Sequence, residues 1–286
     1  MRCVNTLHMG RMTETKGSLL LAWQVKDKHC LVIGAGDVAL SRIHHLIIAQ
    51  AKVTVVTGIS KDVHPEILDL NAQGKIHKLI QRNYQSEDLQ MYETASTQLD
   101  YTKLVLDDFK EVANLVNESF ACVCCCIDDY ALSTKIYYQC KLLRLPVNIA
   151  DKPPLCDFYF GSMINQDNLQ IMISTNGKSP RLSKLIKDNI ARQFSGVDVN
   201  KAIENLGLIR SRLRELILID DDLVTIDARM SWIKELTDFY TIKQWSSITL
   251  TSENTDSPYE KVDKIVKCFP EYPPCDFVDF VKFIDT

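Results

Sequence analysis

The first 150 residues alternate between short apolar runs and amphipathic segments. The apolar runs are typical of buried strands in a parallel sheet, because helices cover both faces of such a sheet. The predicted strands are 30–33, 53–57, 76–80, 103–106, 121–127 and 147–150, and the predicted helices are 37–50, 65–71, 108–116 and 131–143. Residues 81–100 are polar and predicted to be loop with one helical turn. The alternation predicts an α/β fold with a doubly wound parallel sheet over residues 18–150.

The pattern changes after Pro153-Pro154. Two β-like runs, 158–164 and 169–174, flank a turn-rich connection and precede an amphipathic helix over 180–194. A hairpin with one helix is too small to bury its apolar face alone, so residues 151–195 are predicted to pack on a second copy of the chain. Helical periodicity then continues over 202–218, 227–240, 259–268 and 276–284, which predicts a helical domain over 196–286.

A glycine turn follows the first predicted strand. Gly34-Ala35-Gly36 stops the apolar run, a helical pattern opens at Asp37, and Ala39 takes the third position of the Gly-x-Gly-x-x-Gly/Ala fingerprint. Such a turn lets backbone N–H groups approach a phosphate at a helix N-terminus. A turn without a ligand would use the same residues, but the following strand favours a Rossmann-like dinucleotide site.

The second predicted strand lacks the acidic residue that usually binds the adenosine ribose. It ends in Thr57-Gly58-Ile59-Ser60, with no carboxylate before Asp62. We therefore expect Thr57 or backbone groups to hold the ribose. Lys61 leaves NADP open as an alternative to NAD.

Asp151 follows the last predicted strand of the sheet, at the edge where ligands bind in doubly wound folds. A carboxylate there serves general acid/base chemistry or orients a cofactor; an Asx-turn before Pro153 is the structural alternative. Lys178 and Arg181 make the start of the 180–194 helix basic, which suits an anion, although a solvated charged face explains the same pattern.

Composition narrows the class of protein. The net charge of −4 argues against nucleic-acid or membrane-surface binding, and no apolar stretch approaches a membrane span. Residues 1–17 read as an N-terminal extension rather than a secretory signal. The ten cysteines include Cys122, Cys124, Cys125 and Cys126 within one apolar run, where thiols act as small hydrophobes. This usage predicts a reducing, cytoplasmic location and no metal site built from cysteine.

The histidines limit metal chemistry further. All six lie at or before His77, so the hairpin and the helical domain have no imidazole ligand to offer. No Ser/His/Asp triad or Cys/His pair is indicated.

Four stretches resemble the siroheme synthase family of precorrin-2 dehydrogenases and sirohydrochlorin ferrochelatases, most closely its fungal bifunctional members. They begin at Gln24, Val147, Leu169 and Leu236, and the second and third are long and distinctive: Val-Asn-Ile-Ala-Asp-Lys-Pro continuing to Phe-Tyr-Phe-Gly, and Leu-Gln-Ile with Ser-Thr-Asn-Gly followed by Ser-Pro-Arg. The resemblance spans residues 18 to about 245.

The resemblance implies a homodimer in which NAD accepts a hydride as precorrin-2 is oxidised to sirohydrochlorin, after which Fe²⁺ is inserted as co-substrate to give siroheme. The essential aspartate of the family falls on Asp151, as a general acid/base. The implied cofactor-binding residues are Gly34, Gly36, Asp37, Val38, Thr57, Gly58, Ile59 and Cys126. Lys152, Lys178 and Arg181 would form a basic rim for the carboxylated tetrapyrrole. Thr175 stands where bacterial members carry a phosphorylatable serine, which leaves that regulation open.

The sequence is compatible with two other hypotheses. The chain could be a precorrin-2 dehydrogenase without chelatase activity, because no histidine lies near the expected cleft. It could also be a non-catalytic nucleotide-binding module that acts as a redox sensor.

Overall fold

The computed structural model describes residues 18–59, 63–93, 102–103, 105–115, 117–216, 223–251 and 258–286. Two compact units make up this part of the chain: residues 19–160 form one, and residues 161–286 together with Ser18 form the other. The predicted extension over residues 1–17 lies outside the described residues.

The first unit contains a parallel five-stranded sheet in the order β3-β2-β1-β4-β5. The strands are β1 (His29–Ile33), β2 (Lys52–Thr57), β3 (Lys78–Gln81), β4 (Cys122–Cys125) and β5 (Val147–Ile149). Strand order reverses between β1 and β4, which is the position where doubly wound sheets bind ligands at their carboxyl edge. The predicted fold class is confirmed.

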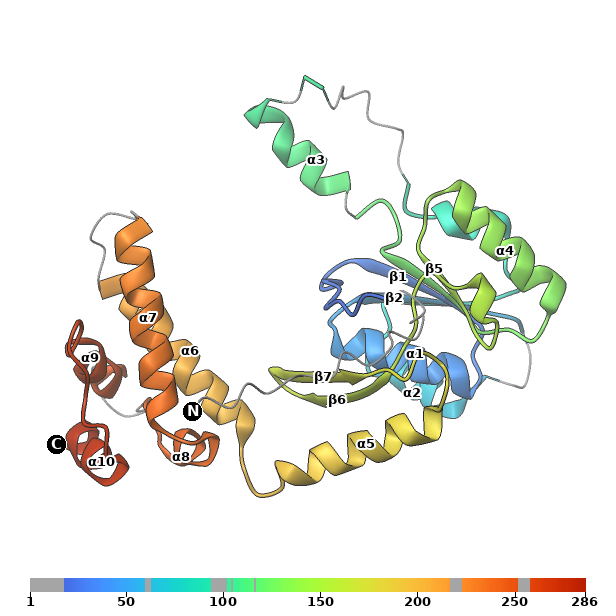
Figure 1. Cartoon of the computed structure of the whole chain (residues 1–286). Helices are drawn as coiled ribbons and strands as arrows, with labels where there is room; N and C mark the ends of the chain where they lie inside the picture. The colour runs from blue at the N-terminus through green and yellow to red at the C-terminus, as the bar shows by residue number, and fades with distance from the viewer. Residues whose placement is uncertain are drawn as a thin grey trace, which may run out of the picture. The chain divides into compact units, whose positions relative to one another are not determined.

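Helices cover both faces of this sheet (Figure 1). The helices of the unit are α1 (Asp37–Ile48), α2 (Pro65–Ala72), α3 (Phe109–Leu115) and α4 (Tyr130–Leu142), with 3₁₀ turns η1 (Ser86–Gln90), η2 (Leu106–Asp108) and η3 (Pro153–Leu155). One core joins α1 and α2 to Cys30, Val32, Val53, Val55, Cys122 and Cys124. The other joins α4 to Leu31, Ile33, Val56, Val123, Cys125 and Val147. Successive strand residues therefore face opposite cores, which is why these strands are apolar throughout.

The prediction of a strand over 103–106 is wrong for those residues of the range that the structure describes. Leu106 begins the 3₁₀ turn η2 and is 80 % exposed, so this run has no buried face that would hold it in a sheet. The N–H of Val105 donates to Oδ2 of Asp108 at 3.0 Å instead of to a neighbouring strand.

The second unit begins with an antiparallel hairpin of β6 (Ser162–Gln166) and β7 (Leu169–Ile173), as predicted. Its helices are α5 (Pro180–Gln193), α6 (Val199–Leu216), α7 (Leu223–Phe239), α8 (Ile242–Ser247), α9 (Glu260–Val266) and α10 (Phe277–Asp285). An apolar core gathers Ile209, Trp232, Leu236, Trp245 and Phe280 from α6, α7, α8 and α10. Asn205 is buried in this unit, and its amide donates to the carbonyl oxygens of Trp245 and Ile248 at 2.9 and 3.1 Å.

Helix α8 was not predicted from the apolar pattern. A capping box starts it: Thr241 Oγ1 accepts from the N–H of Gln244, and the Gln244 side chain accepts from the N–H of Thr241. This Thr-x-x-Gln signature is visible in the sequence.

Within the described residues, no helix is long and apolar enough to cross a bilayer.

Candidate functional site

The glycine turn joins β1 to α1 at the carboxyl edge of the sheet. Gly34 has φ of +108°, and a Cβ there would lie 2.2 Å from the carbonyl oxygen of Cys126. The Cys126 N–H in turn donates to the Ile33 carbonyl at 2.7 Å. Gly34 is therefore required for the close approach of β1 to the chain after β4, a structural role that the fingerprint alone does not separate from phosphate binding.

Gly36 has a different environment. It precedes α1 with φ of −86°, no atom other than those of Gly36 and its two chain neighbours lies within 4 Å of the position that a Cβ would take, and no side chain caps the helix. The first N–H groups of α1 therefore face open space at the positive end of the helix dipole. An uncapped helix N-terminus behind a residue without a side chain fits a pyrophosphate. Asp37 and Val38, the first two residues of α1, are both exposed.

The adenosine side of such a site would lie at the end of β2. Thr57 is buried, whereas Ile59 is 87 % exposed. A Cβ at Gly58 would meet Oδ1 of Asn83 at 2.9 Å, so the Asn83 amide lies against the backbone just after β2. Sequence reasoning missed Asn83, although its place two residues after β3 puts it at the same edge of the sheet. Lys61 and Asp62, which bear on the NADP alternative, lie outside the described residues.

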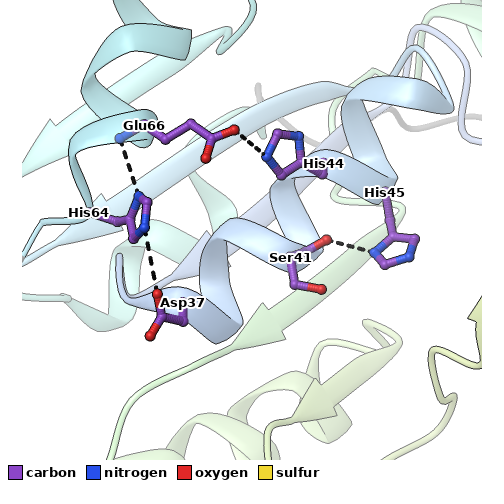
Figure 2. Close-up of polar contacts among 6 residues, drawn as sticks. All are labelled: Asp37, Ser41, His44, His45, His64 and Glu66. Atoms are coloured by element: carbon purple, nitrogen blue, oxygen red, sulfur yellow. Dashed lines mark hydrogen bonds and ion pairs between the residues drawn. The ribbon is translucent and has the colours of Figure 1, made fainter. Parts of the chain in front are cut away.

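A chain of polar contacts links α1 to α2 beside the glycine turn (Figure 2). The His64 N–H donates to the Ala35 carbonyl at 2.8 Å, and His64 Nε2 lies 3.5 Å from Oδ1 of Asp37. The Glu66 N–H donates to His64 Nδ1 at 3.2 Å, and the Glu66 carboxylate contacts His44 Nε2 at 2.8 Å. His64 therefore touches both the turn and the first residue of α1.

Asp151 lies two residues after β5, at the same edge of the sheet as the glycine turn. Its φ is +58°, in the left-handed region that Asp tolerates better than most residues. The turn is held by the Ala150 N–H, which donates to the Cys125 carbonyl at 2.9 Å. Asp151 is exposed, and no other described residue gives its carboxylate a hydrogen bond or ion pair. The carboxylate is thus free to accept a proton or a hydrogen bond from a ligand.

Lys152 points toward the N-terminal turn of α4. Its amine donates a hydrogen bond to Ser133 Oγ and lies 4.7 Å from the centre of the Tyr130 ring. Ser133 is buried, so Lys152 is anchored beside the Asp151 turn rather than extended into solvent.

Arg42 is a cation near this edge that sequence reasoning missed. Its guanidinium lies 4.4 Å from the centre of the Phe160 ring, and its buried Nε has no partner among the described residues. Burial raises the pKa of the Cys126 thiol; the nearby Arg42 guanidinium lowers it by a smaller amount, and Asp151 raises it further. A cation with a buried donor that lacks a protein partner makes Arg42 a candidate to bind an anionic group. The only signal in the sequence was the position of Arg42 on the helix that follows the glycine turn.

The cysteines of the sheet are buried and act as hydrophobes, as predicted. Burial raises the pKa of Cys125, Cys126 and Cys140 to about 12, so these thiols stay protonated and are poor nucleophiles. No group of three or more His, Cys, Asp or Glu side chains within the described ranges is arranged to hold a metal ion.

Lys178 and Arg181 belong to the second unit, at the start of α5, and both are exposed. Thr175 Oγ1 accepts from the N–H of Ser179 at 3.2 Å and lies 3.0 Å from Ser183 Oγ. Thr175 therefore has a local structural role in the turn before α5.

Family models of three parts match the chain in order. Residues 21–162 match a model described as NAD(P)-binding, residues 166–193 the central part of sirohaem biosynthesis proteins, and residues 197–255 their C-terminal part. The siroheme biosynthesis protein of Schizosaccharomyces pombe is 32 % identical over 90 % of this chain and 82 % of its own. That of Saccharomyces cerevisiae is 37 % identical over 81 % of this chain and 86 % of its own. The chain belongs to the siroheme biosynthesis family.

Bacterial members of this family match a smaller part of the chain. The siroheme synthase of Thioalkalivibrio sulfidiphilus is 32 % identical over 58 % of this chain and 28 % of its own length. Among solved structures, SirC, a precorrin-2 dehydrogenase, has a TM-score of 0.46 and 20 % identity over 76 % of this chain and 100 % of its own.

Proposed function

We propose that this member of the siroheme family oxidises precorrin-2 to sirohydrochlorin with NAD as hydride acceptor, and that Asp151 is its catalytic residue. The observation on which this depends is the placement of Asp151 in a left-handed turn at the carboxyl edge of the sheet, exposed and with its carboxylate unpaired by described residues. Backbone strain of this kind persists where the surrounding structure maintains it, and it is often found at active sites.

The glycine turn supports the cofactor part of the proposal. The N-terminal N–H groups of α1 would hold the pyrophosphate behind Gly36, and Thr57, Gly58 and Ile59 would line the adenosine side. When bound, the nicotinamide supplies the hydride-accepting chemistry. The ends of β1 and β5 are separated by two strand spacings, about 10 Å in all. A cofactor and a large substrate can therefore share this edge between Gly36 and Asp151.

The oxidation removes one hydride and one proton from the macrocycle. Asp151 would accept the proton as a general base. Arg42, which lies near Cys126, and Lys152, which follows Asp151, would offset the negative charge of the substrate carboxylates. Lys178 and Arg181, both exposed at the start of α5, are also proposed to bind substrate carboxylates.

The second reaction that we propose is insertion of Fe²⁺ into sirohydrochlorin to give siroheme. The metal ion is a substrate here, and each insertion releases two pyrrole protons. The same carboxylate, Asp151, is suited to accept them. In the part of the chain that the structure describes, no histidine or cysteine cluster accompanies it, so the macrocycle nitrogens would supply the metal ligands.

We also propose that the chain works as a homodimer of three functional parts, with residues 18–150 binding NAD, residues 151–195 forming the dimer contact and residues 196–286 forming the helical domain. Exposed Leu182, Leu185 and Ile186 on α5 support the dimer contact, because monomeric soluble proteins rarely expose a contiguous apolar patch. Sedimentation of the whole chain would test this: a monomer at micromolar concentration contradicts it.

Two assays separate the two activities. Precorrin-2 with NAD⁺ should produce NADH in step with sirohydrochlorin, and absence of NADH formation contradicts the dehydrogenase. Sirohydrochlorin with Fe²⁺ and no NAD⁺ should give the siroheme absorbance faster than the uncatalysed reaction. A rate equal to the uncatalysed one would mean that the chain is a dehydrogenase without chelatase activity.

A further inference from the structure

The end of β2 does not supply the carboxylate that commonly binds the adenosine ribose. Thr57, Gly58, Ile59 and Ser60 contain no acidic side chain. A carboxylate from another element could take its place only if it lay beside both the glycine turn and the chain that follows β2. Asp37 meets the first condition, because it is the first residue of α1.

His64 connects Asp37 to the chain that follows β2. It precedes α2, its N–H donates to the Ala35 carbonyl at 2.8 Å, and its ring lies against the carboxylate of Asp37, with Nε2 3.5 Å from Oδ1. The carboxylate of Asp37 therefore lies at the start of α1 and beside His64, the residue that precedes α2 (Figure 2). A ribose joined to a pyrophosphate at the N-terminus of α1 would occupy this region.

The hydrogen bonds of His64 determine its tautomer. Because Nδ1 accepts from the N–H of Glu66, the neutral ring carries its proton on Nε2. The proton is therefore on the ring nitrogen that lies 3.5 Å from Oδ1 of Asp37. The Asp37 side chain is 94 % exposed, so the carboxylate keeps accepting capacity for a second donor.

We propose that Asp37 and His64 together replace the missing carboxylate of β2: Asp37 accepts hydrogen bonds from the adenosine ribose hydroxyls, and His64 is the positioning residue that orients it. This inference rests on the proposed dinucleotide site. A carboxylate at this place repels a 2′-phosphate, so the pair also sets a preference for NAD⁺ over NADP⁺.

The pair can be tested by dinucleotide binding without any tetrapyrrole. NAD⁺ and NADP⁺ are titrated calorimetrically into the whole wild-type chain and into Asp37→Asn, His64→Asn, His64→Ala and His44→Asn. Asn is a good N-cap residue, so His64→Asn keeps the acceptor for Glu66 N–H but does not reach Asp37. His44→Asn breaks the neighbouring contact with Glu66 and leaves the His64–Asp37 contact in place. It is the matched control.

We expect the wild type to bind NAD⁺ at least about tenfold more tightly than NADP⁺, and Asp37→Asn to remove most of this ratio by weakening NAD⁺ binding about tenfold. His64→Asn should lower the ratio about threefold without changing the melting temperature, and His44→Asn should leave it unchanged. The ratio of the two affinities is the deciding quantity. If Asp37 affected only the pyrophosphate, its loss of charge would change the NAD⁺ and NADP⁺ affinities equally and leave their ratio unchanged.

Unchanged ratios in both Asp37→Asn and His64→Asn would overturn the inference while leaving the dinucleotide site intact. A wild-type chain that binds neither dinucleotide would instead contradict the proposed function itself.

Discussion

A Cβ at Gly34 would lie 2.2 Å from the carbonyl oxygen of Cys126, much closer than a Cβ lies to any non-bonded atom in folded proteins. The φ of +108° at Gly34 is equally unsuitable for any other residue. We expect Gly34→Ala to destabilise the chain by about 2 kcal/mol or more, because the turn and the β1–β4 contact must both shift. Denaturant unfolding measures this, and a loss below about 0.5 kcal/mol would show that the turn relaxes freely.

Gly36→Ala is the matched substitution two residues away. No atom beyond its two chain neighbours lies within 4 Å of the added methyl group and φ is −86°, so stability should stay within about 0.5 kcal/mol of the wild type. The methyl group would occupy the space in front of the α1 N-terminus, so NAD⁺ affinity should fall about tenfold or more. Calorimetric titration with NAD⁺ tests this. An affinity equal to that of the wild type would show that the pyrophosphate does not bind beside Gly36.

His29 should make the fold sensitive to mild acid. Its ring is buried against Tyr92, with centroids 3.7 Å apart, and Nδ1 has no partner among the described residues. Burial first, then the charges of His77 and Lys52, lower its pKa from 6.5 to about 4. The unfolded chain therefore binds a proton that the folded chain excludes, and stability falls by up to about 3 kcal/mol as pH decreases from 6.5 to 4.

A Phe at this position keeps the aromatic packing and cannot titrate. His29→Phe should therefore have a flatter unfolding free energy between pH 6.5 and 4, while His45, whose pKa burial also lowers, keeps its own contribution in both proteins. Chemical denaturation across this pH range is the measurement. Parallel curves for the two proteins would assign the acid sensitivity to other groups.

Arg42 should act on the tetrapyrrole rather than on the dinucleotide. Its buried, unpartnered Nε and its place near Cys126 suit a carboxylate. We expect Arg42→Gln to weaken sirohydrochlorin binding about tenfold and to leave NAD⁺ affinity within about twofold. Arg42→Lys keeps the charge but not the planar guanidinium, so its affinity for sirohydrochlorin should lie between those of the wild type and Arg42→Gln. Equal tetrapyrrole affinity in all three proteins would exclude Arg42 from the substrate site.

The sheet was predictable from sequence because its strands are apolar on both faces. Cys122 to Cys125 gave a strong signal for this reason: alternate thiols face the α1 core and the α4 core. The strand predicted over 103–106 was wrong, because the apolar pattern of four residues does not reveal whether another surface covers them. Helix α8 was missed because its signal is a cap at Thr241 rather than a periodicity.

The candidate site was predictable where one motif contains it. Gly34, Gly36 and Asp151 each stand in a stretch whose local pattern indicates chemistry. Arg42 and Asn83 stand in ordinary helical or loop sequence, and only the folded sheet brings them to its carboxyl edge. The histidines were visible in the sequence, but the tautomer of His64 depends on its hydrogen bond with Glu66, which no pattern contains.

Asp151→Asn tests the account most directly, because Asn tolerates the same left-handed backbone and removes only the basic carboxylate. In a stopped assay of precorrin-2 with NAD⁺, monitored by NADH formation, we expect the rate to fall about 100-fold or more while NAD⁺ affinity and the melting temperature stay at wild-type values. A variant that still oxidises precorrin-2 within about threefold of the wild-type rate would contradict the assignment of Asp151 as the catalytic base.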